Sequence, residues 1–445
     1  MGARTGIIYC LCLLGAVSAR SQSAVPARRL ASFAERAQSS GIRLRYIPDS
    51  ALPRLRIGRA MIYAPSAGWL YNHHASITKF KGWLIACWSD GMKDEDAPGQ
   101  RVVFAVSKDF YHWSMPQVLA APGLYNGDTA NILTAAGFHH FGDTLVAYYG
   151  SYSPKRQHTR LWAKVSTDGR HWSSPLDMQV PVNPNHGPQW AGRRLIISGN
   201  FTFPYTDDPR GLSGWKISSF YPDSVWGDHG PAAGANPNAD AAAAAGPEPS
   251  PKPGANTAPK PDPGPAAGAG PIPFEDNPAT FYAPAARCGL PPLCEGSFFQ
   301  TGDSVLHMLL RVTGKGWKGR LWLTESRDGG VHWSFPAETA FPDNDSKFHF
   351  GKLPDGRYYY VGIPDTLHHY ARTPLVLALS GDGKYFDRSW LIADEPYALK
   401  KEGLWKGGQY GYPHTLIDGG YCYVIISRQK EAIEVLRFPL DLLKY

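Results

Sequence analysis

A short turn motif recurs along this chain of 445 residues, and it constrains the fold more than any other feature. The clearest copy spans Ser326–Trp333 and reads S-x-D-x-G-x-x-W; weaker copies occur at Ser107–Trp113, Ser166–Trp172 and Ser380–Phe386. Each copy follows an apolar, strand-like stretch. In such a turn the Asp side chain accepts hydrogen bonds from backbone amides, Gly supplies a positive φ, and the aromatic residue packs the next strand into the core. The motif therefore predicts a series of β-hairpins.

The spacing of these turns predicts a β-propeller. The interval from Asp109 to Asp168 is close to that from Asp328 to Asp382. A degenerate copy at Asp223–Trp226 falls one such period after Asp168. Self-similarity at this period, with one four-stranded unit per repeat, is typical of propellers. Five turns and a further strand pair at the C-terminus predict an all-β, six-bladed propeller. The 47 Gly and 39 Pro residues exclude a helical bundle, because they interrupt the chain too often for long helices.

The chain is predicted to be one domain with a leader and an insertion. Residues 1–19 contain a single cation, Arg4, an apolar run over 7–14 and a small-residue end, which is typical of a secretory signal peptide. Residues 20–445 then form a single propeller domain. Within it, a Pro/Ala/Gly-rich tract at about 228–273 lacks aromatic residues and is predicted to be a disordered surface insertion. We therefore expect a secreted or periplasmic protein.

Charge and cysteine content restrict the function classes. The formal net charge of +7 arises from 45 basic and 38 acidic residues without a long Lys/Arg run, so nucleic acid is not an expected partner. No stretch reaches the roughly 20 apolar residues of a membrane span. The short Pro-containing loop from Cys288 to Cys294 is one that a disulfide could close. No Cys/His set has zinc-ligand spacing, so no metal or cofactor is expected. The sequence carries no signal of the oligomeric state.

The turn motif resembles the Asp box of the sialidase, or neuraminidase, superfamily. The resemblance covers the chain from about Tyr71 to the C-terminus apart from the insertion, and it implies a sialidase-like propeller. In that superfamily the Asp box is a structural turn remote from the active site. The resemblance therefore implies that the motif aspartates determine the fold: Asp109, Asp168, Asp328 and Asp382.

Four further residues follow the order in which sialidases carry their catalytic groups. Glu295 begins a strand-like segment, Arg311 follows at the end of the next such segment, and Arg372 lies about one repeat beyond Arg311. The segment Tyr412–Leu416 resembles the one that carries the sialidase nucleophile. By this resemblance Tyr412 attacks the sugar, Glu295 accepts its proton, and both arginines bind a carboxylate. The residue types fit, because Tyr needs a base at its free pKa of about 10 and guanidinium groups donate paired hydrogen bonds.

The first blade departs from the sialidase pattern. Where sialidases place their first carboxylate-binding Arg, this chain has Tyr71–Ile77, which contains His73 and His74. A His can donate one hydrogen bond to a carboxylate but not the paired bonds of Arg. The acidic loop Asp94–Asp96 lies where the family keeps its acid/base Asp, and we assign that role to Asp96, with Asp94 and Glu95 as the alternatives.

These observations lead to three functional hypotheses. The first is an exported exo-glycosidase that removes a terminal acidic sugar, sialic acid or a relative, with retention. His73 and His74 favour a second, a polysaccharide lyase or rhamnosyl-glucuronate-cleaving enzyme in which a neutral His abstracts the C5 proton of a uronate. The missing first-blade Arg favours a third, a non-catalytic glycan-binding propeller. All three have an acidic glycan as partner. The first requires the catalytic and binding residues to converge at one end of the propeller axis, with Tyr412 in hydrogen-bonding reach of Glu295.

Overall fold

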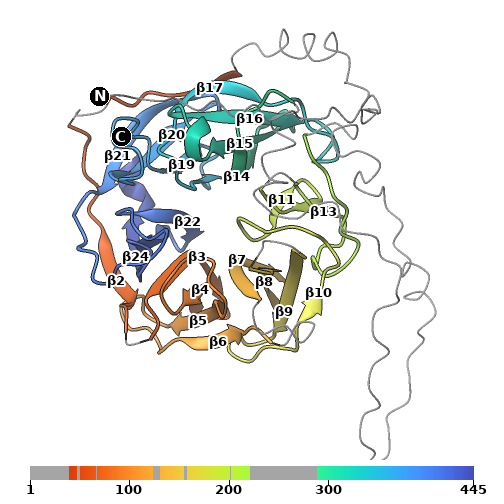
Figure 1. Ribbon diagram of the computed structural model, residues 1–445. Helices are drawn as coiled ribbons and strands as arrows, with labels where there is room; N and C mark the ends of the chain where they lie inside the picture. The colour runs from red at the N-terminus through yellow and green to blue at the C-terminus, as the bar shows by residue number, and fades with distance from the viewer. Residues whose placement is uncertain are drawn as a thin grey trace, which may run out of the picture. The chain divides into compact units, whose positions relative to one another are not determined.

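The chain folds into β-sheets arranged in a ring (Figure 1). The computed structural model describes residues 40–47, 51–66, 68–123, 131–154, 158–200, 202–220 and 288–444. All of these belong to one compact unit, Ala37–Tyr445. Three features predicted above lie outside the described residues: the leader at 1–19, the degenerate turn Asp223–Trp226 and the insertion at about 228–273.

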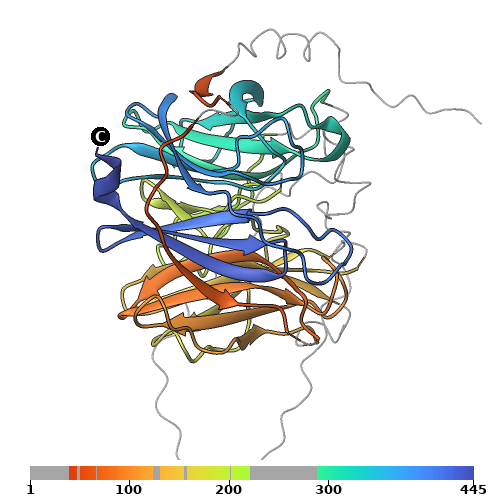
Figure 2. The same cartoon turned by 90° about the vertical axis from the view of Figure 1, so that its left-hand side faces the viewer.

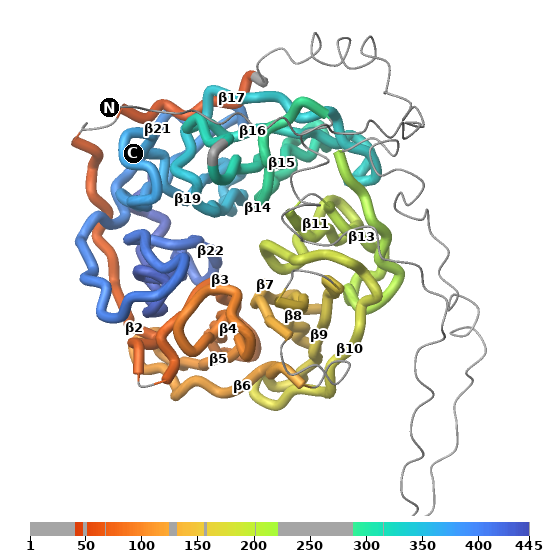
Figure 3. The backbone as a smooth tube through the Cα atoms, in the orientation of Figure 1, coloured from red at the N-terminus to blue at the C-terminus, as the bar shows by residue number. Residues whose placement is uncertain are grey.

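Three sheets come from the first half of the chain. Two are four-stranded antiparallel meanders, of β3 (Tyr71–Phe80), β4 (Trp83–Gly91), β5 (Arg101–Ser107) and β6 (Gln117–Ala120), and of β7 (Ile132–Phe141), β8 (Thr144–Tyr152), β9 (Arg160–Ser166) and β10 (Leu176–Asp177). The third is smaller and consists of β11 (Gln189–Ala191), β12 (Arg194–Ile196) and β13 (Tyr205–Thr206). The first strand of each sheet lies nearest the centre of the ring (Figure 3).

A nine-stranded sheet joins two more meanders. They consist of β14 (Leu293–Gln300), β15 (Leu306–Val312), β16 (Arg320–Ser326) and β17 (Ala337–Pro342), and of β18 (His349–Lys352), β19 (Tyr358–Gly362), β20 (Leu375–Ser380) and β21 (Tyr385–Ala393). Between them lies β1 (Ser40–Leu44), parallel to both β17 and β21. A strand from the N-terminal part of the unit, β1, therefore links two meanders that the C-terminal part forms.

The last sheet combines both ends of the described chain. It consists of β22 (Gly411–Asp418), β23 (Tyr421–Arg428), β24 (Ala432–Pro439) and β2 (Gly58–Tyr63). Figure 2 shows β2 running along β24, and the two pair antiparallel. Beyond the strands there are short 3-10 helices, η3 (Gly314–Gly316) and η4 (Leu440–Leu443). In the described part of the chain, no helix has the length and apolar character needed to cross a bilayer.

The apolar core is divided among the interfaces between neighbouring sheets. Ala75 and Trp88 of β3 and β4 pack with Ile425 of β23, and Phe104 of β5 packs with Leu133 of β7. Because most sheets are covered on both faces, strands such as β15 and β20 are buried at every position. This burial explains why they read as continuous apolar runs rather than as alternating patterns.

The described copies of the turn motif form the predicted hairpins, each between the third and fourth strand of a meander. One carboxylate oxygen of Asp168 accepts the backbone amides of Arg170 and His171, both at 2.8 Å. The Ser166 hydroxyl donates to the same carboxylate at 3.1 Å. Equivalent amide bonds are accepted by Asp109, Asp328 and Asp382. These aspartates stabilise the fold, as the sequence predicted.

One loop prediction is wrong. Cys294 is a buried free thiol, so no disulfide joins it to Cys288. Cys294 instead lies within β14, where its backbone pairs with Arg311 of β15. Burial holds the pKa of its thiol well above the ordinary value, which makes it a poor nucleophile.

Candidate active site

The candidate site is built at irregularities in the innermost strands. β3, β14 and β22 each carry a register shift near their first residues. His74, Glu295 and Tyr412 lie at these shifts, with φ values of 54°, 24° and 53°. Two loop residues, Asp96 and Arg372, also have positive φ, at 56° and 52°. Such backbone strain costs a non-Gly residue roughly 1–2 kcal/mol and concentrates at functional sites.

Tyr412 and Glu295 are in direct contact across two sheets. The Tyr412 hydroxyl donates to Glu295 Oε2 at 2.7 Å. Arg311 orients both groups, since its Nε donates to the same Oε2 at 2.5 Å and its Nη2 donates to the Tyr412 oxygen at 2.9 Å. A hydroxyl paired with a carboxylate that a third group orients is the arrangement of an activated nucleophile and its base.

Tyr410 is arranged differently, although only one residue separates it from Tyr412. It is fully buried, and its hydroxyl donates to the backbone oxygen of Glu395 at 2.9 Å. Tyr412 keeps 5% of its surface exposed, and Glu295 keeps 9%. Only Tyr412 therefore joins the acid–base cluster.

Opposing effects set the pKa values of this pair. Burial acts to raise the pKa of Glu295, but the charges of Arg311 and Lys347 and the Tyr412 hydrogen bond outweigh it and lower the pKa to about 2. Burial raises the pKa of Tyr412 well above 10, and the charge of Glu295 adds to the rise, while Arg311 and Arg372 oppose it. The resting state is therefore a neutral phenol beside a carboxylate, which is the state from which a base accepts a proton.

Arg311 and Arg372 differ in how much of their hydrogen-bonding capacity is used. Arg311 pairs with Glu295 on one side and with Asp345 on the other. Arg372 Nη1 is buried and has no hydrogen-bond partner among the described residues. The Arg372 guanidinium lies 5.2 Å from the centroid of the Tyr412 ring. Of the two arginines, Arg372 has the donor available for a ligand.

His73 and His74 both lie beside Tyr412. Their ring centroids are 4.1 Å and 5.3 Å from that of Tyr412. His73 Nδ1 lies 2.6 Å from Ser427 Oγ, whereas its Nε2 is buried without a partner among the described residues. Burial is the largest cause that lowers the pKa of both rings, to about 3 for His74. Both imidazoles are therefore neutral, not the cations that an Arg position would hold.

Lys347 also belongs to this cluster, and the sequence analysis missed it. It is buried two residues before β18, its Nζ lies 4.9 Å from the Tyr412 ring centroid, and it donates to the Asn185 carbonyl. Burial lowers its pKa to about 8. The available signal was its place two residues before an inner strand, since Glu295 and Tyr412 also lie near the starts of their strands.

The acidic loop divides its three carboxylates among different partners. Asp94 accepts the Leu404 amide at 2.6 Å, away from the cluster. Glu95 pairs with Lys430 and accepts the Tyr71 hydroxyl at 3.1 Å. Asp96 accepts the Tyr152 hydroxyl at 2.5 Å. Glu95 and Asp96 both act electrostatically on Lys430, whereas Asp94 bonds the Leu404 backbone.

One set of ligand-type atoms lies within this site. Nitrogens of His73 and His74 and a carboxylate oxygen of Glu95 are all within 4.8 Å of one another. Lys430 already neutralises Glu95, and Lys430, Arg372 and Lys347 all act against a positive charge on His73. This electrostatic environment favours an anionic ligand over a metal ion.

Comparison with known proteins identifies the fold. The BNR repeat-like domain matches residues 285–424. A protein of unknown function from Dyadobacter fermentans has a structure that matches with a TM-score of 0.54 at 12% identity, over 86% of this chain and 99% of that one. Trypanosoma rangeli sialidase matches with a TM-score of 0.53 at 11% identity, over 87% of this chain and 60% of the sialidase. Its complex with the inhibitor DANA gives the same TM-score at 12% identity, over 87% of this chain and 61% of that one. No curated protein sequence is significantly similar to this chain.

Proposed function

We propose that this chain, whose residues 285–424 match the BNR repeat-like domain and whose fold is similar to that of Trypanosoma rangeli sialidase, is an exo-glycosidase that removes a terminal acidic sugar from glycans with retention of configuration. The observation that carries the proposal is the hydrogen bond of 2.7 Å from Tyr412 to Glu295, with Arg311 bound to both. The fold alone, without this pair, would not support a retaining hydrolase with a Tyr nucleophile.

The first chemical step forms a tyrosyl–sugar bond. The Tyr412 oxygen attacks the anomeric carbon while its proton passes to Glu295, and the glycosidic C–O bond breaks. Asp96 protonates the departing oxygen. A neutral nucleophile suits a sugar with a carboxylate at the anomeric carbon, because an Asp or Glu nucleophile would be repelled.

The second step reverses these roles. Asp96, now ionised, takes a proton from a water molecule that attacks the anomeric carbon from the opposite side. The bond to the Tyr412 oxygen breaks, and Glu295 returns the proton to the phenolate. Both groups are then restored, as microscopic reversibility requires of a double displacement.

The substrate carboxylate is proposed to bind Arg372 and Lys347. Arg372 has an unpartnered Nη1, and Lys347 brings a second cation to within 4.9 Å of the Tyr412 ring centroid. Arg311 already has two carboxylate partners, so we assign it mainly to orienting Tyr412 and Glu295. Neutral His73 and His74 contribute hydrogen bonds rather than charge. This set of one Arg, one Lys and two neutral His differs from three carboxylate-binding Arg side chains. The preferred sugar is therefore an acidic one whose carboxylate needs fewer paired hydrogen bonds.

The test compares Tyr412→Phe with Tyr410→Phe on a panel of aryl glycosides of acidic sugars. Loss of the Tyr412 hydroxyl is expected to lower kcat by at least about 1000-fold, whereas Tyr410→Phe is expected to retain activity because its hydroxyl bonds only Glu395 and lies outside the cluster. Binding without turnover by the wild type would instead support the glycan-binding hypothesis. Equal activity of both variants would exclude Tyr412 as nucleophile.

The role of Asp96 has its own test. Asp96→Asn is expected to slow hydrolysis of substrates with poor leaving groups far more than of activated aryl glycosides, because only a poor leaving group needs the proton. Glu95→Gln serves as the control. If Glu95→Gln rather than Asp96→Asn shows this dependence on the leaving group, Glu95 is the acid.

A polysaccharide lyase is the second candidate, and the neutral His73 favours it. Its unpartnered Nε2, adjacent to Arg372 and Lys347, is placed like a base beside a charge-neutralised uronate. Elimination would create a new unsaturated product that absorbs in the ultraviolet, whereas hydrolysis would not. That absorbance, lost in His73→Gln but retained in Tyr412→Phe, would select the lyase.

The proposal extends to blade count and export. We count the two meanders of the nine-stranded sheet as separate blades, because each begins with its own inner strand and only β1 joins them. This count makes the propeller six-bladed. The leader-like residues 1–19 support export, and N-terminal sequencing of the mature protein, with a start at residue 20 expected, tests it.

A further inference from the structure

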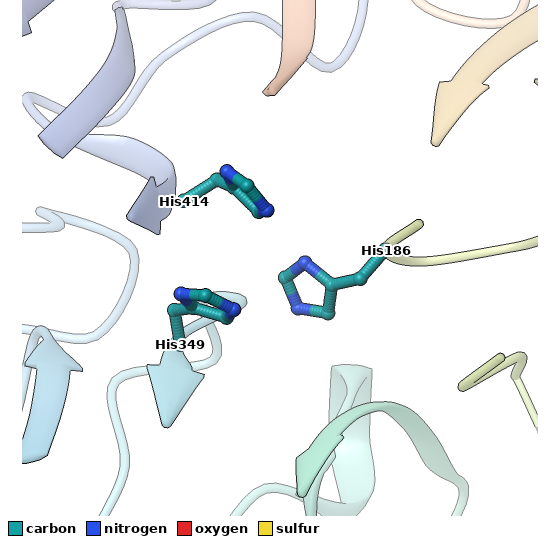
Figure 4. Close-up of side chains that lie close together, drawn as sticks. All are labelled: His186, His349 and His414. Atoms are coloured by element: carbon teal, nitrogen blue, oxygen red, sulfur yellow. The ribbon is translucent and has the colours of Figure 1, made fainter. Parts of the chain in front are cut away.

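A second histidine cluster lies outside the acid–base site. His186 comes from the loop between β10 and β11, His349 begins β18, and His414 lies in β22. Figure 4 shows the three rings converging from separate elements. One ring nitrogen of each residue lies within 4.8 Å of those of the other two. Ring centroids are 4.6 Å apart for His349 and His414, and 5.1 Å apart for His186 and His349.

His186 carries an unsatisfied nitrogen in this cluster. The residue is only 2% exposed, and Nε2 has no hydrogen-bond partner among the described residues. The backbone of Phe348 hydrogen-bonds the ring, so the other nitrogen is used. A buried polar atom without a partner keeps the desolvation cost of its burial uncompensated. A ligand that accepts the lone pair of Nε2 would remove this cost.

The other two rings have neighbours that orient them. Thr415 holds the His349 ring at Nδ1, with Oγ1 at 2.5 Å and its backbone amide at 3.1 Å, and Oγ1 also lies 2.7 Å from Tyr359 Oη. Gln189 Nε2 lies 3.0 Å from His349 Nε2. His414 Nδ1 has only long contacts, at 3.4 Å from the Ile77 amide and 3.5 Å from Ser76 Oγ. Outer partners of this kind fix the tautomer and direction of a metal-binding imidazole.

The charge of the surroundings also bears on a ligand. Burial is the largest cause that lowers the pKa of all three histidines, so the rings are neutral. The lone pair of His349 Nδ1 accepts the Thr415 amide at 3.1 Å, and that of His414 Nδ1 accepts the Ile77 amide at 3.4 Å. A metal ion would bind their Nε2 atoms once the ring proton has moved to Nδ1, and at His349 it would displace Gln189 Nε2, which lies 3.0 Å away. Lys347 is the charged group that acts on all three, and its Nζ is directed to the Asn185 carbonyl. This cation weakens a metal site but does not block the nitrogens.

We propose that His186, His349 and His414 form a three-histidine site for a divalent transition-metal ion, with Zn²⁺ as the best match. Three neutral imidazoles with an open fourth position form a common zinc ligand set. Zn–N bonds of about 2.0–2.1 Å require nitrogens about 3.4 Å apart in a tetrahedral site. Separations of up to 4.8 Å need side-chain rotations of the order of an ångström to reach this geometry.

Such a metal ion would cross-link elements of the propeller near its axis. It would join three separate sheets or loops, and two of its ligands lie two residues after Lys347 and Tyr412 in sequence. Bound metal would therefore stabilise the folded unit and hold the starts of β18 and β22. This inference does not depend on the proposed glycosidase activity, because it concerns ligand chemistry and stability alone.

The experiment titrates the chelator-treated full chain with Zn²⁺ by calorimetry and with Co²⁺ by visible spectroscopy. We expect one equivalent to bind, a tetrahedral Co²⁺ absorption to appear, and Tm to rise with added Zn²⁺. His186→Gln and His414→Gln should each weaken binding at least about 100-fold. Lys347→Met should tighten binding because it removes the opposing charge. His74→Gln, in the other ligand-type set, should leave binding unchanged.

Several results would overturn the proposal. One is that the wild type binds no stoichiometric Zn²⁺ or Co²⁺. Another is that His186→Gln and His414→Gln both bind metal with unchanged affinity. A third is that, of the variants, only His74→Gln loses metal binding. If His186→Gln does not fold, two other variants still decide the question. Unchanged metal affinity in His414→Gln would contradict the site. The absence of a tetrahedral Co²⁺ absorption in Lys347→Met would also contradict it.

Discussion

Gly408 offers a direct test of how Arg372 is positioned. Its φ is 83°, and a Cβ at this position would lie 2.5 Å from Arg372 Cδ and 3.0 Å from its Cγ. Ala in this conformation costs roughly 1–2 kcal/mol, and overpacking adds roughly 1–3 kcal/mol. The Gly408→Ala variant is therefore expected to lose about 2–5 kcal/mol of unfolding free energy unless Arg372 moves.

Movement of Arg372 would itself affect function. A displacement of about 1 Å in a binding group can cost on the order of 100-fold in rate. We expect kcat/KM of Gly408→Ala on an acidic aryl glycoside to fall by up to about this factor, chiefly through KM, because Arg372 is proposed to bind the carboxylate in ground and transition states alike.

The matched control is Gly82→Ala in the hairpin between β3 and β4. Gly82 has a similar φ of 79°, but a Cβ there meets no atom within 4 Å. It should show only the conformational cost of roughly 1–2 kcal/mol and unchanged kinetics. Urea unfolding and steady-state kinetics of both variants test the argument. Equal losses of stability and equal kcat/KM in the two variants would refute it.

Three further predictions concern charge and packing. Glu295 has a pKa of about 2 and acts as a carboxylate, so kcat/KM should fall on the acidic side only as the pH drops through about 2. A fall in kcat/KM near pH 4–5 that disappears in Glu295→Gln would contradict this. The pKa of Asp109 is also lowered to about 2, chiefly by hydrogen bonds from His112. Its contribution to stability is full above the unfolded pKa of about 3.9 and is lost as pH falls through about 2. Urea unfolding across pH should show the difference between wild type and Asp109→Asn shrinking from pH 5 to pH 2, and a constant difference would be inconsistent with it. In the second turn motif, Gly169→Ala would place a Cβ 2.4 Å from Ile85 Cδ1 at a φ of 75°, with an expected loss of about 2–4 kcal/mol; Ile85→Val should restore part of the Tm, and no rescue would show that backbone strain dominates.

Local features of the fold were predictable from sequence because their contacts are local. The carboxylate of Asp168 bonds residues two and three positions further along the chain, so the motif contains nearly all of its own partners. Strands such as β15 and β20 were also readable, because their continuous apolar runs report burial on both faces. The partnership of β2 with β24 was not predicted, since no local pattern specifies which distant strand completes a sheet.

The candidate site was predictable only in part. The order of Glu295, Arg311, Arg372 and Tyr412 was visible through resemblance, yet the contact between Tyr412 and Glu295 spans 117 residues of sequence. The side chain of Lys347 and the second partner of Arg311, Asp345, left no recognisable motif. Choosing between Asp96 and Glu95 likewise depends on Lys430 and Tyr152, which come from other sheets.

The sequence by itself determined the repeating hairpins, because each is stabilised by bonds within a few residues. The closure of the ring decided the rest. It brings strand starts from distant repeats together around one axis, and register shifts at those starts turn Glu295 and Tyr412 toward each other. The same closure gathers His186, His349 and His414, whose sequence spacing predicts no metal site. Proximity of this kind is a property of the closed propeller, since no single repeat contains the set.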